Sequence, residues 1–119
     1  MRVYLSGKIG RSAEISKATL EKFASRERFL LEQGCEVFNP TTSGLGAQAE
    51  KLASENGTDF YTEILLLDLA ELRKCDAIYL LHDWEESPGS CAEVTYAVAI
   101  GKSVMSETRG GDLGLWGKA

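Results

Sequence analysis

The segment 75–101 constrains the fold of this chain more than any other. It begins with an apolar run, CDAIYLL (75–81), continues through a polar, turn-rich stretch, HDWEESPGS (82–90), and ends in CAEVTYAVAIG (91–101), whose apolar residues have helical spacing. This order predicts a buried strand, a loop and a helix. Ligands of α/β proteins usually bind where a strand delivers a loop into a helix N-terminus. We therefore expect the functional site at this loop, with Glu93 in the first helical turn as the leading candidate.

Further strand and helix signals flank this unit in a regular order. Strands are predicted at 2–6, 35–38 and 102–105, and helices at 13–33 and 58–74, the latter with Thr58 as its N-cap. Residues 41–57 are rich in small residues and predict either a mobile lid or a loop and short helix. The alternation predicts a parallel sheet with helices on both faces. We expect one domain, 1–119, with a flavodoxin-like (Rossmann-like) three-layer α/β fold and four or five parallel strands.

Charge and composition exclude several classes of function. A net charge of −5 argues against a nucleic-acid polymer as partner, because binding to a phosphate backbone needs a basic face. No apolar window approaches the roughly 20 residues of a membrane span, so a soluble, cytoplasmic protein without a membrane partner is expected. Three cysteines without C-x-x-C spacing indicate buried, reduced thiols. With a single histidine beside them, no metal site or cofactor is expected.

In a parallel sheet, the loops that follow the strands meet at one edge, which predicts a shared crevice here. The turn after the first strand is neither a P-loop nor a G-x-G-x-x-G fingerprint, and it is equally consistent with an anion site and an ordinary turn. The backbone N–H groups and hydroxyls at the start of the last helix form a plausible anion cradle. The candidate binding residues are Gly7, Lys8, Ile9, Arg11, Asn39, Ser87, Gly89 and Ser90.

Several candidates also have an ordinary structural interpretation. Ser90 and Glu93 fit the capping box S-x-x-E, and spacing alone favours that interpretation. Asp68 lies within an apolar helix, where a solvated position at the edge of the stripe is favoured because buried unpaired carboxylates are rare. Trp84 could stack on a nucleobase or pack as an exposed loop tip. His82 is better explained as a strand-end residue than as a catalytic base.

Four segments together are similar to one known superfamily. They are VYLSGKIGR (3–11), Asn39-Pro40, FYTEILLLDLAELRKCDAIYLL (60–81) and ESPGSCAEVTYAVAIGK (86–102). In this order they resemble the nucleoside 2-deoxyribosyltransferase superfamily, whose members cleave N-glycosidic bonds. The resemblance implies that Glu93 is the nucleophile, that Asp68 holds sugar hydroxyls or protonates the leaving base, and that Tyr4 orients the glutamate. We also expect Glu93 to be ionised with a low pKa, as a carboxylate at a helix N-terminus would be.

The glutamate loop indicates the branch of the superfamily. Ser87 stands six residues before the glutamate, where true transferases usually carry an aspartate, and with Gly89 it resembles the 2′-deoxynucleoside 5′-monophosphate N-hydrolases. The expected function is therefore hydrolysis of a (deoxy)nucleoside 5′-monophosphate to free base and sugar 5-phosphate. Base exchange between deoxynucleosides is the second hypothesis, and a non-catalytic nucleotide-binding protein is the third.

The helix at 58–74 also bears on assembly. Its apolar residues point in too many directions for one buried face, which predicts cover by the sheet and by a partner chain in a homodimer. The glycine-rich tail has Leu113, Leu115 and Trp116 as its only apolar anchors, and it is expected to fray or to dock on a neighbouring subunit.

Overall fold

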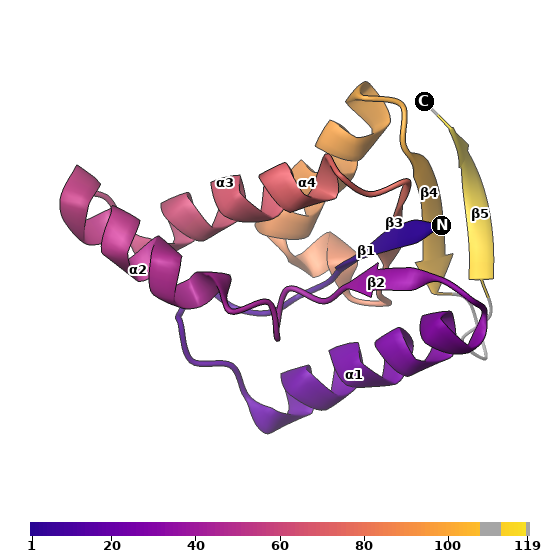
Figure 1. Cartoon of the computed structure of the whole chain (residues 1–119), viewed down its shortest axis with the longest axis horizontal. Coiled ribbons are helices and arrows are strands. Elements are labelled where there is room, and N and C mark those ends of the chain that lie inside the picture. Colours follow the sequence, from indigo (N-terminus) through magenta and orange to yellow (C-terminus); the bar gives the residue numbers. More distant parts are fainter. Residues whose placement is uncertain (108–112, 119) are drawn as a thin grey trace.

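Five strands lie side by side in the order β2-β1-β3-β4-β5 (Figure 1). The computed structural model describes residues 1–107 and 113–118, with side chains up to residue 107. The strands are β1 (Arg2–Ser6), β2 (Glu36–Phe38), β3 (Ala77–Leu80), β4 (Ser103–Glu107) and β5 (Leu113–Lys118). The first four are parallel, as predicted, whereas β5 pairs antiparallel with β4. The tail was expected to fray or to dock on a neighbouring subunit, but its backbone at 113–118 instead pairs with β4 of the same chain. The side chains of Leu113, Leu115 and Trp116 lie outside the described residues.

The helices begin where side chains satisfy their first N–H groups. They are α1 (Lys17–Glu32), α2 (Leu45–Asn56), α3 (Phe60–Leu72) and α4 (Pro88–Ala99), with a short 3₁₀ turn, η1, at Trp84–Glu86. Ser16 caps α1, so this helix begins later than the predicted residue 13. Asp59 caps α3 by accepting from the N–H of Thr62, which corrects the assignment of Thr58. The Thr58 hydroxyl instead donates to Glu63.

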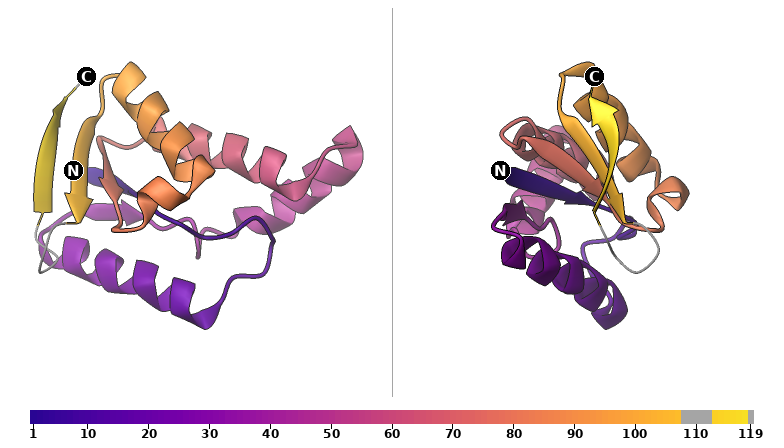
Figure 2. Two further views of the ribbon diagram at one scale, coloured as in Figure 1. Left: turned by 180° about the vertical axis from the view of Figure 1, so that it is seen from behind. Right: turned by 90° about the vertical axis from the view of Figure 1, so that its right-hand side faces the viewer.

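The two faces of the sheet bury two separate cores. Alternate residues of β1 point to opposite faces, as strand geometry requires. Val3 and Leu5 pack with Phe23 of α1. Tyr4 packs on the other face with Leu72 of α3 and with residues of α4. Figure 2 shows α1 on one side of the sheet and α4 on the other, so the predicted three-layer architecture is confirmed.

Residues 41–57 form a loop and a helix, α2, as one of the two predicted alternatives describes. α2 packs along α3, and the pair extends beyond the end of the sheet (Figure 1). Gly44 and Gly57 flank α2 with positive φ angles of 80° and 67°, a conformation that residues with a Cβ adopt rarely. Within the described ranges, no helix is long and apolar enough to cross a membrane.

Candidate functional site

A pocket of about 520 Å³ lies where the loops after the parallel strands meet. The loop after β1, the loop between β2 and α2, the start of α4 and one side of α3 supply its walls. Both Glu93 and Asp68 line it. The sequence prediction of a shared crevice at the carboxyl edge of the sheet is therefore confirmed.

The Glu93 carboxylate is held by two hydroxyl groups from β1. The Tyr4 hydroxyl donates to Oε2 at 2.6 Å, and the Ser6 hydroxyl donates to Oε1 at 2.6 Å. The two donors are two residues apart on one strand, so they project to the same face of the sheet. Tyr4 is fully buried and stacks on Phe38, with ring centroids 5.2 Å apart. The two hydroxyls of β1 thus fix the orientation of the Glu93 carboxylate.

The capping box expected at Ser90 and Glu93 is wrong. Ser87 is the N-cap of α4, and its hydroxyl accepts a 3.2 Å hydrogen bond from the Ser90 N–H. The helix therefore begins at Pro88, a residue suited to the first helical position because it has no N–H to satisfy. Glu93 consequently lies in the second turn of α4 and faces the sheet instead of bonding back to the helix start.

Burial gives both carboxylates of the pocket raised pKa values. Desolvation raises the pKa of Glu93 to about 7, although the hydrogen bonds from Ser6 and Tyr4 oppose this rise. The low pKa expected for Glu93 is therefore wrong, because the side chain is buried away from the helix terminus. Desolvation, with the negative charges of Glu93 and Glu71, raises the pKa of Asp68 to about 8. Burial and the charge of Glu93 also raise the pKa of the Tyr4 hydroxyl.

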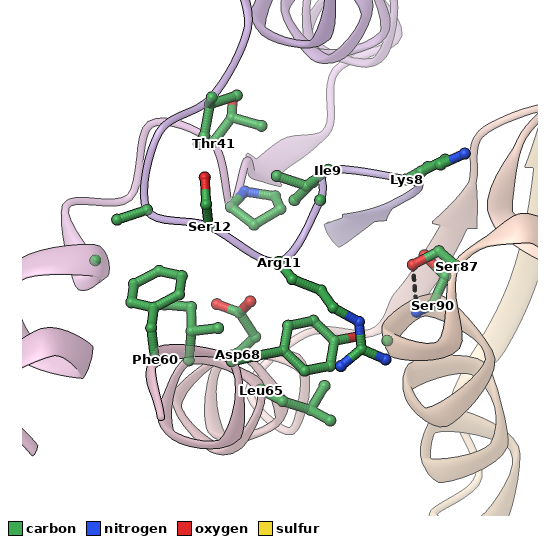
Figure 3. Close-up of a pocket in the computed structure, with 18 of the residues that line it drawn as sticks. Lys8, Ile9, Arg11, Ser12, Thr41, Phe60, Leu65, Asp68, Ser87 and Ser90 are labelled. Atoms are coloured by element: carbon green, nitrogen blue, oxygen red, sulfur yellow. Dashed lines mark hydrogen bonds between the residues drawn. The ribbon is translucent and has the colours of Figure 1, made fainter. Parts of the chain in front are cut away.

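Asp68 is buried and does not occupy a solvated edge of α3. Only 7% of the residue is exposed, and its Oδ1 atom has no hydrogen-bond partner among the described residues. The carboxylate points from α3 into the pocket, toward the loop that follows β1 (Figure 3). A buried carboxylate oxygen without a donor is costly unless it binds something. The sequence-based preference for a solvated position is thus overturned.

The apolar run of α3 is explained mainly by the pocket and the core. Ile64 and Leu65 line the pocket, whereas Leu72 belongs to the core. Leu66, by contrast, is 61% exposed. The apolar side chains of α3 point in several directions because some pack in the core, some line the pocket, and Leu66 faces outward.

The cations of the loop after β1 have different environments. The Arg11 guanidinium lies over the ring of Tyr61, with Cζ 4.3 Å from the ring centroid. Lys8 pairs with Glu86 at 3.3 Å, and Figure 3 shows its side chain directed away from Asp68. Of the two predicted cations, Arg11 is therefore the one placed over the interior of the pocket.

Two of the groups predicted to bind an anion at the start of α4 already bond to each other. The Ser87 hydroxyl and the Ser90 N–H bond to each other, as the dashed line in Figure 3 shows. The Ser90 hydroxyl is buried and has no hydrogen-bond partner in the described part of the chain. Gly89 also lies in the pocket wall, and a Cβ added there would come within 2.7 Å of the Tyr61 hydroxyl. The groups left for a ligand are the Ser90 hydroxyl and the nearby Arg11.

Three other candidates lie outside the pocket. The Asn39 side chain donates to Glu27 and accepts from Thr41, so it holds the loop after β2 together. Trp84 is partly buried against the core cluster on the α3–α4 face, and it does not belong to the pocket lining. His82 is exposed and contacts Glu107 through its ring and its N–H, in agreement with a strand-end role.

Sequence reasoning missed Ser6 and Tyr61. Ser6 could have been found from strand periodicity, because it shares a face with Tyr4 and ends the strand that leads to the glycine turn. Tyr61 could have been found from helical spacing, because it shares one side of α3 with Asp68, although its position beside Gly89 depends on how α3 and α4 pack. Ile9 and Gly7, in contrast, line the pocket as predicted.

Fold and pocket together define a Rossmann-like α/β protein with a pocket at the carboxyl ends of its parallel strands. Two buried carboxylates face this pocket, one of them held by two hydroxyls. The chain belongs to the DUF4406 family, described as a domain of unknown function, which matches residues 1–106. No curated protein matches the sequence.

Proposed function

We propose that this protein hydrolyses the N-glycosidic bond of a (deoxy)nucleoside 5′-monophosphate, releasing free base and sugar 5-phosphate. One observation carries the proposal: Glu93 is oriented by two hydroxyls in the same pocket in which Asp68 is buried with an oxygen lacking a partner. The resemblance to the nucleoside 2-deoxyribosyltransferase superfamily supports it, because the aligned nucleophile and its acidic partner fall on these two residues.

The proposed chemistry follows the logic of a retaining glycosidase. A Glu93 oxygen attacks C1′ and forms a glycosyl ester, while the C1′–N bond breaks and the base takes a proton from Asp68. Water then attacks C1′ and loses a proton to the Asp68 carboxylate. The ester bond breaks, which frees the sugar phosphate and returns Glu93 to its ionised form.

The order of the two pKa values suits these roles. A nucleophile must be ionised and an acid must be protonated, and Asp68 has the higher pKa, about 8 against about 7 for Glu93. Both oxygens of Glu93 accept hydrogen bonds from hydroxyls, an arrangement that favours its charged form.

The 5′-phosphate would bind at the start of α4. Arg11 supplies a positive charge there, and the buried Ser90 hydroxyl supplies a hydrogen-bonding group without a partner among the described side chains. The N-terminal end of a helix also attracts anions. Ser87 would contribute indirectly, because its hydroxyl is already engaged in capping the helix.

Base exchange is the second candidate. Much of the pocket wall is apolar, with Ile9, Ile64 and Leu65 among the contributors. Such a wall would exclude water and give a glycosyl ester time to meet a second base. A nucleotide-binding protein without turnover is the third candidate, and the same experiment distinguishes all three.

We further propose a homodimer. Leu66 of α3 is 61% exposed, and Val98 and Ile100 near the end of α4 are 44% and 39% exposed. Exposed apolar side chains of this size are often covered by a partner subunit. Light scattering on the wild type and on Leu66→Lys tests this: a wild-type monomer at micromolar concentration would contradict the proposal.

A mass-spectrometric screen of (deoxy)nucleoside 5′-monophosphates for base release tests the function directly. Glu93→Gln should lower the rate by at least about 10³-fold, since the covalent route would be lost. Glu63→Gln is the matched control, because Glu63 is equally buried on α3 but bonds to Thr58, outside the pocket. A new nucleoside formed after addition of a second base would favour exchange. Tight nucleotide binding without base release would favour the non-catalytic protein, and unchanged turnover in Glu93→Gln would refute the mechanism.

A further inference from the structure

Two charged side chains outside the pocket hold the loop that follows β1. Lys22 of α1 and Asp83, which follows β3, form an ion pair with an Nζ–Oδ2 distance of 2.5 Å. Lys22 also donates to the backbone carbonyl of Lys8 at 2.7 Å, and Asp83 Oδ1 accepts from the backbone N–H of Lys8 at 3.1 Å. We call these two side chains and their bonds to Lys8 the brace. Both polar groups of the Lys8 backbone are bound by it.

The brace is largely shielded from water. The side chains of Lys22 and Asp83 are 19% and 12% exposed. Burial acts to raise the pKa of Asp83, but the bonds from Lys22 and the Lys8 N–H outweigh it, so this pKa lies below its usual value. An ion pair with additional hydrogen bonds in such a setting is more sensitive to loss of one partner than a surface pair.

The close approach of the loop to Asp83 requires a glycine. A Cβ at Gly7 would lie 2.9 Å from Leu81 Cβ and 3.2 Å from Asp83 Oδ1. A glycine immediately before Lys8 therefore lets the backbone reach the carboxylate. The same loop carries Arg11, three residues further along the chain.

Asp83 is connected to the other wall of the pocket through the short η1 turn. It directly precedes η1, whose hydrogen bonds run from the Glu86 N–H to Asp83 and from the Ser87 N–H to Trp84. Ser87 then caps α4. The short path from Asp83 to Ser87 is thus held by the hydrogen bonds of η1, and it joins the brace to the start of α4.

We propose that Lys22 and Asp83 are positioning residues that set the distance between Arg11 and the start of α4, and thereby determine affinity for the 5′-phosphate of the substrate. This inference rests on the proposed function for its substrate. Its structural half, that the brace holds the loop over the pocket, stands on the contacts alone. Neither residue lines the pocket, so neither acts on the substrate directly.

Lys22→Met tests the brace, because it keeps the aliphatic stem and removes the ammonium group. The double variant Lys22→Met/Asp83→Asn removes both charges, so it leaves no unpaired ion if the single variant folds poorly. Lys17→Met, the same substitution at an exposed position of α1, is the matched control.

Hydrogen exchange measured by mass spectrometry gives a readout independent of activity. Both brace variants should speed exchange in the peptide covering 7–16, with no change in α3, and Lys17→Met should match the wild type. Unchanged exchange in this loop would contradict the proposal that the brace holds it in place.

Kinetics test the second half of the inference. KM for a nucleoside 5′-monophosphate should rise about tenfold with kcat within about twofold, while KM for the nucleoside without phosphate stays constant. An equal rise for both substrates, or a lower melting temperature as the sole effect, would show a merely structural role and overturn the positioning proposal. A wild-type protein that releases no base from any substrate would refute the proposed function, and hydrogen exchange would then decide the brace.

Discussion

The Tyr4 hydroxyl donates a 2.6 Å hydrogen bond to Glu93 across 89 positions of sequence. This bond joins the first strand to the last helix, and it is made between two buried groups. A hydrogen bond to a carboxylate favours the charged form, so Tyr4 counteracts the effect of burial on the pKa of Glu93. The nucleophile proposed here thus depends on a residue that does not line the pocket itself.

Tyr4→Phe should lower kcat/KM by about 10- to 100-fold, the loss expected for a hydrogen bond to a charged group. It should also raise the pKa of Glu93 further, so the acidic limb of the pH profile of kcat/KM should move to higher pH. Tyr96→Phe on α4 is the control. A Tyr4→Phe profile that coincides with the wild-type profile would show that this bond does not tune Glu93.

Asp68→Asn should abolish base release and stabilise the fold. The pKa of Asp68 is about 8 in the folded state against a usual value of 3.8, so the folded state binds the proton more tightly. The contribution of Asp68 to stability is therefore complete below pH 4 and is lost as the pH rises toward 8.

Thermal melts of wild type and Asp68→Asn, recorded from pH 5 to pH 8.5, check the stability part of this prediction. The variant should melt at a higher temperature than the wild type at pH 8.5, and the difference should shrink steadily as the pH falls from 8 to 5. A difference independent of pH would mean that Asp68 is not protonated in the folded protein.

Substitutions of Ser87 and Ser90 should have different effects, because Ser87 caps α4 whereas the Ser90 hydroxyl, which has no partner among the described residues, is free to bind a ligand. Ser87→Ala removes the N-cap of α4, which should cost about 1 kcal/mol and lower the melting temperature by several degrees. Ser90→Ala removes a buried hydroxyl without a hydrogen-bond partner among the described residues, so stability should stay constant or rise slightly. Binding of a nucleoside 5′-monophosphate should nevertheless weaken about 3- to 10-fold in Ser90→Ala. Thermal melts measure the stability of both variants, and calorimetry measures their affinity for the nucleotide. Lower stability in Ser90→Ala with weaker binding in Ser87→Ala would contradict these assignments.

Gly89→Ala should displace Tyr61, because the new Cβ would lie 2.7 Å from the Tyr61 hydroxyl. That shift would disturb the stacking of Arg11 and should lower kcat/KM about tenfold. The double variant Gly89→Ala/Tyr61→Phe lacks the hydroxyl and should recover most of the activity. Absence of recovery would show that Gly89 is needed for another reason, such as close approach of the substrate.

Local patterns were enough to place most of the secondary structure. The β-forming residues of β1, the apolar run of β3 and the polar loop after β3 are properties of neighbouring residues, and they led to the three-layer fold and to the edge that carries the pocket. The helix starts were less accurate. Ser16, Asp59 and Ser87 cap their helices, but Thr58 and Ser90 are equally good caps by residue type, and backbone geometry chooses between them.

The chemistry of the pocket was decided by tertiary structure. Spacing made Glu93 a capping residue and Asp68 a solvated one, whereas packing against β1 and the neighbouring loops buried both. Burial, the bonds from Tyr4 and Ser6, and the brace between Lys22 and Asp83 join residues far apart in the chain. The sequence by itself determined most of the helices and strands and the edge of the sheet at which the loops meet. A pKa or a hydrogen bond depends on groups brought together in space, and only the folded chain specifies those neighbours.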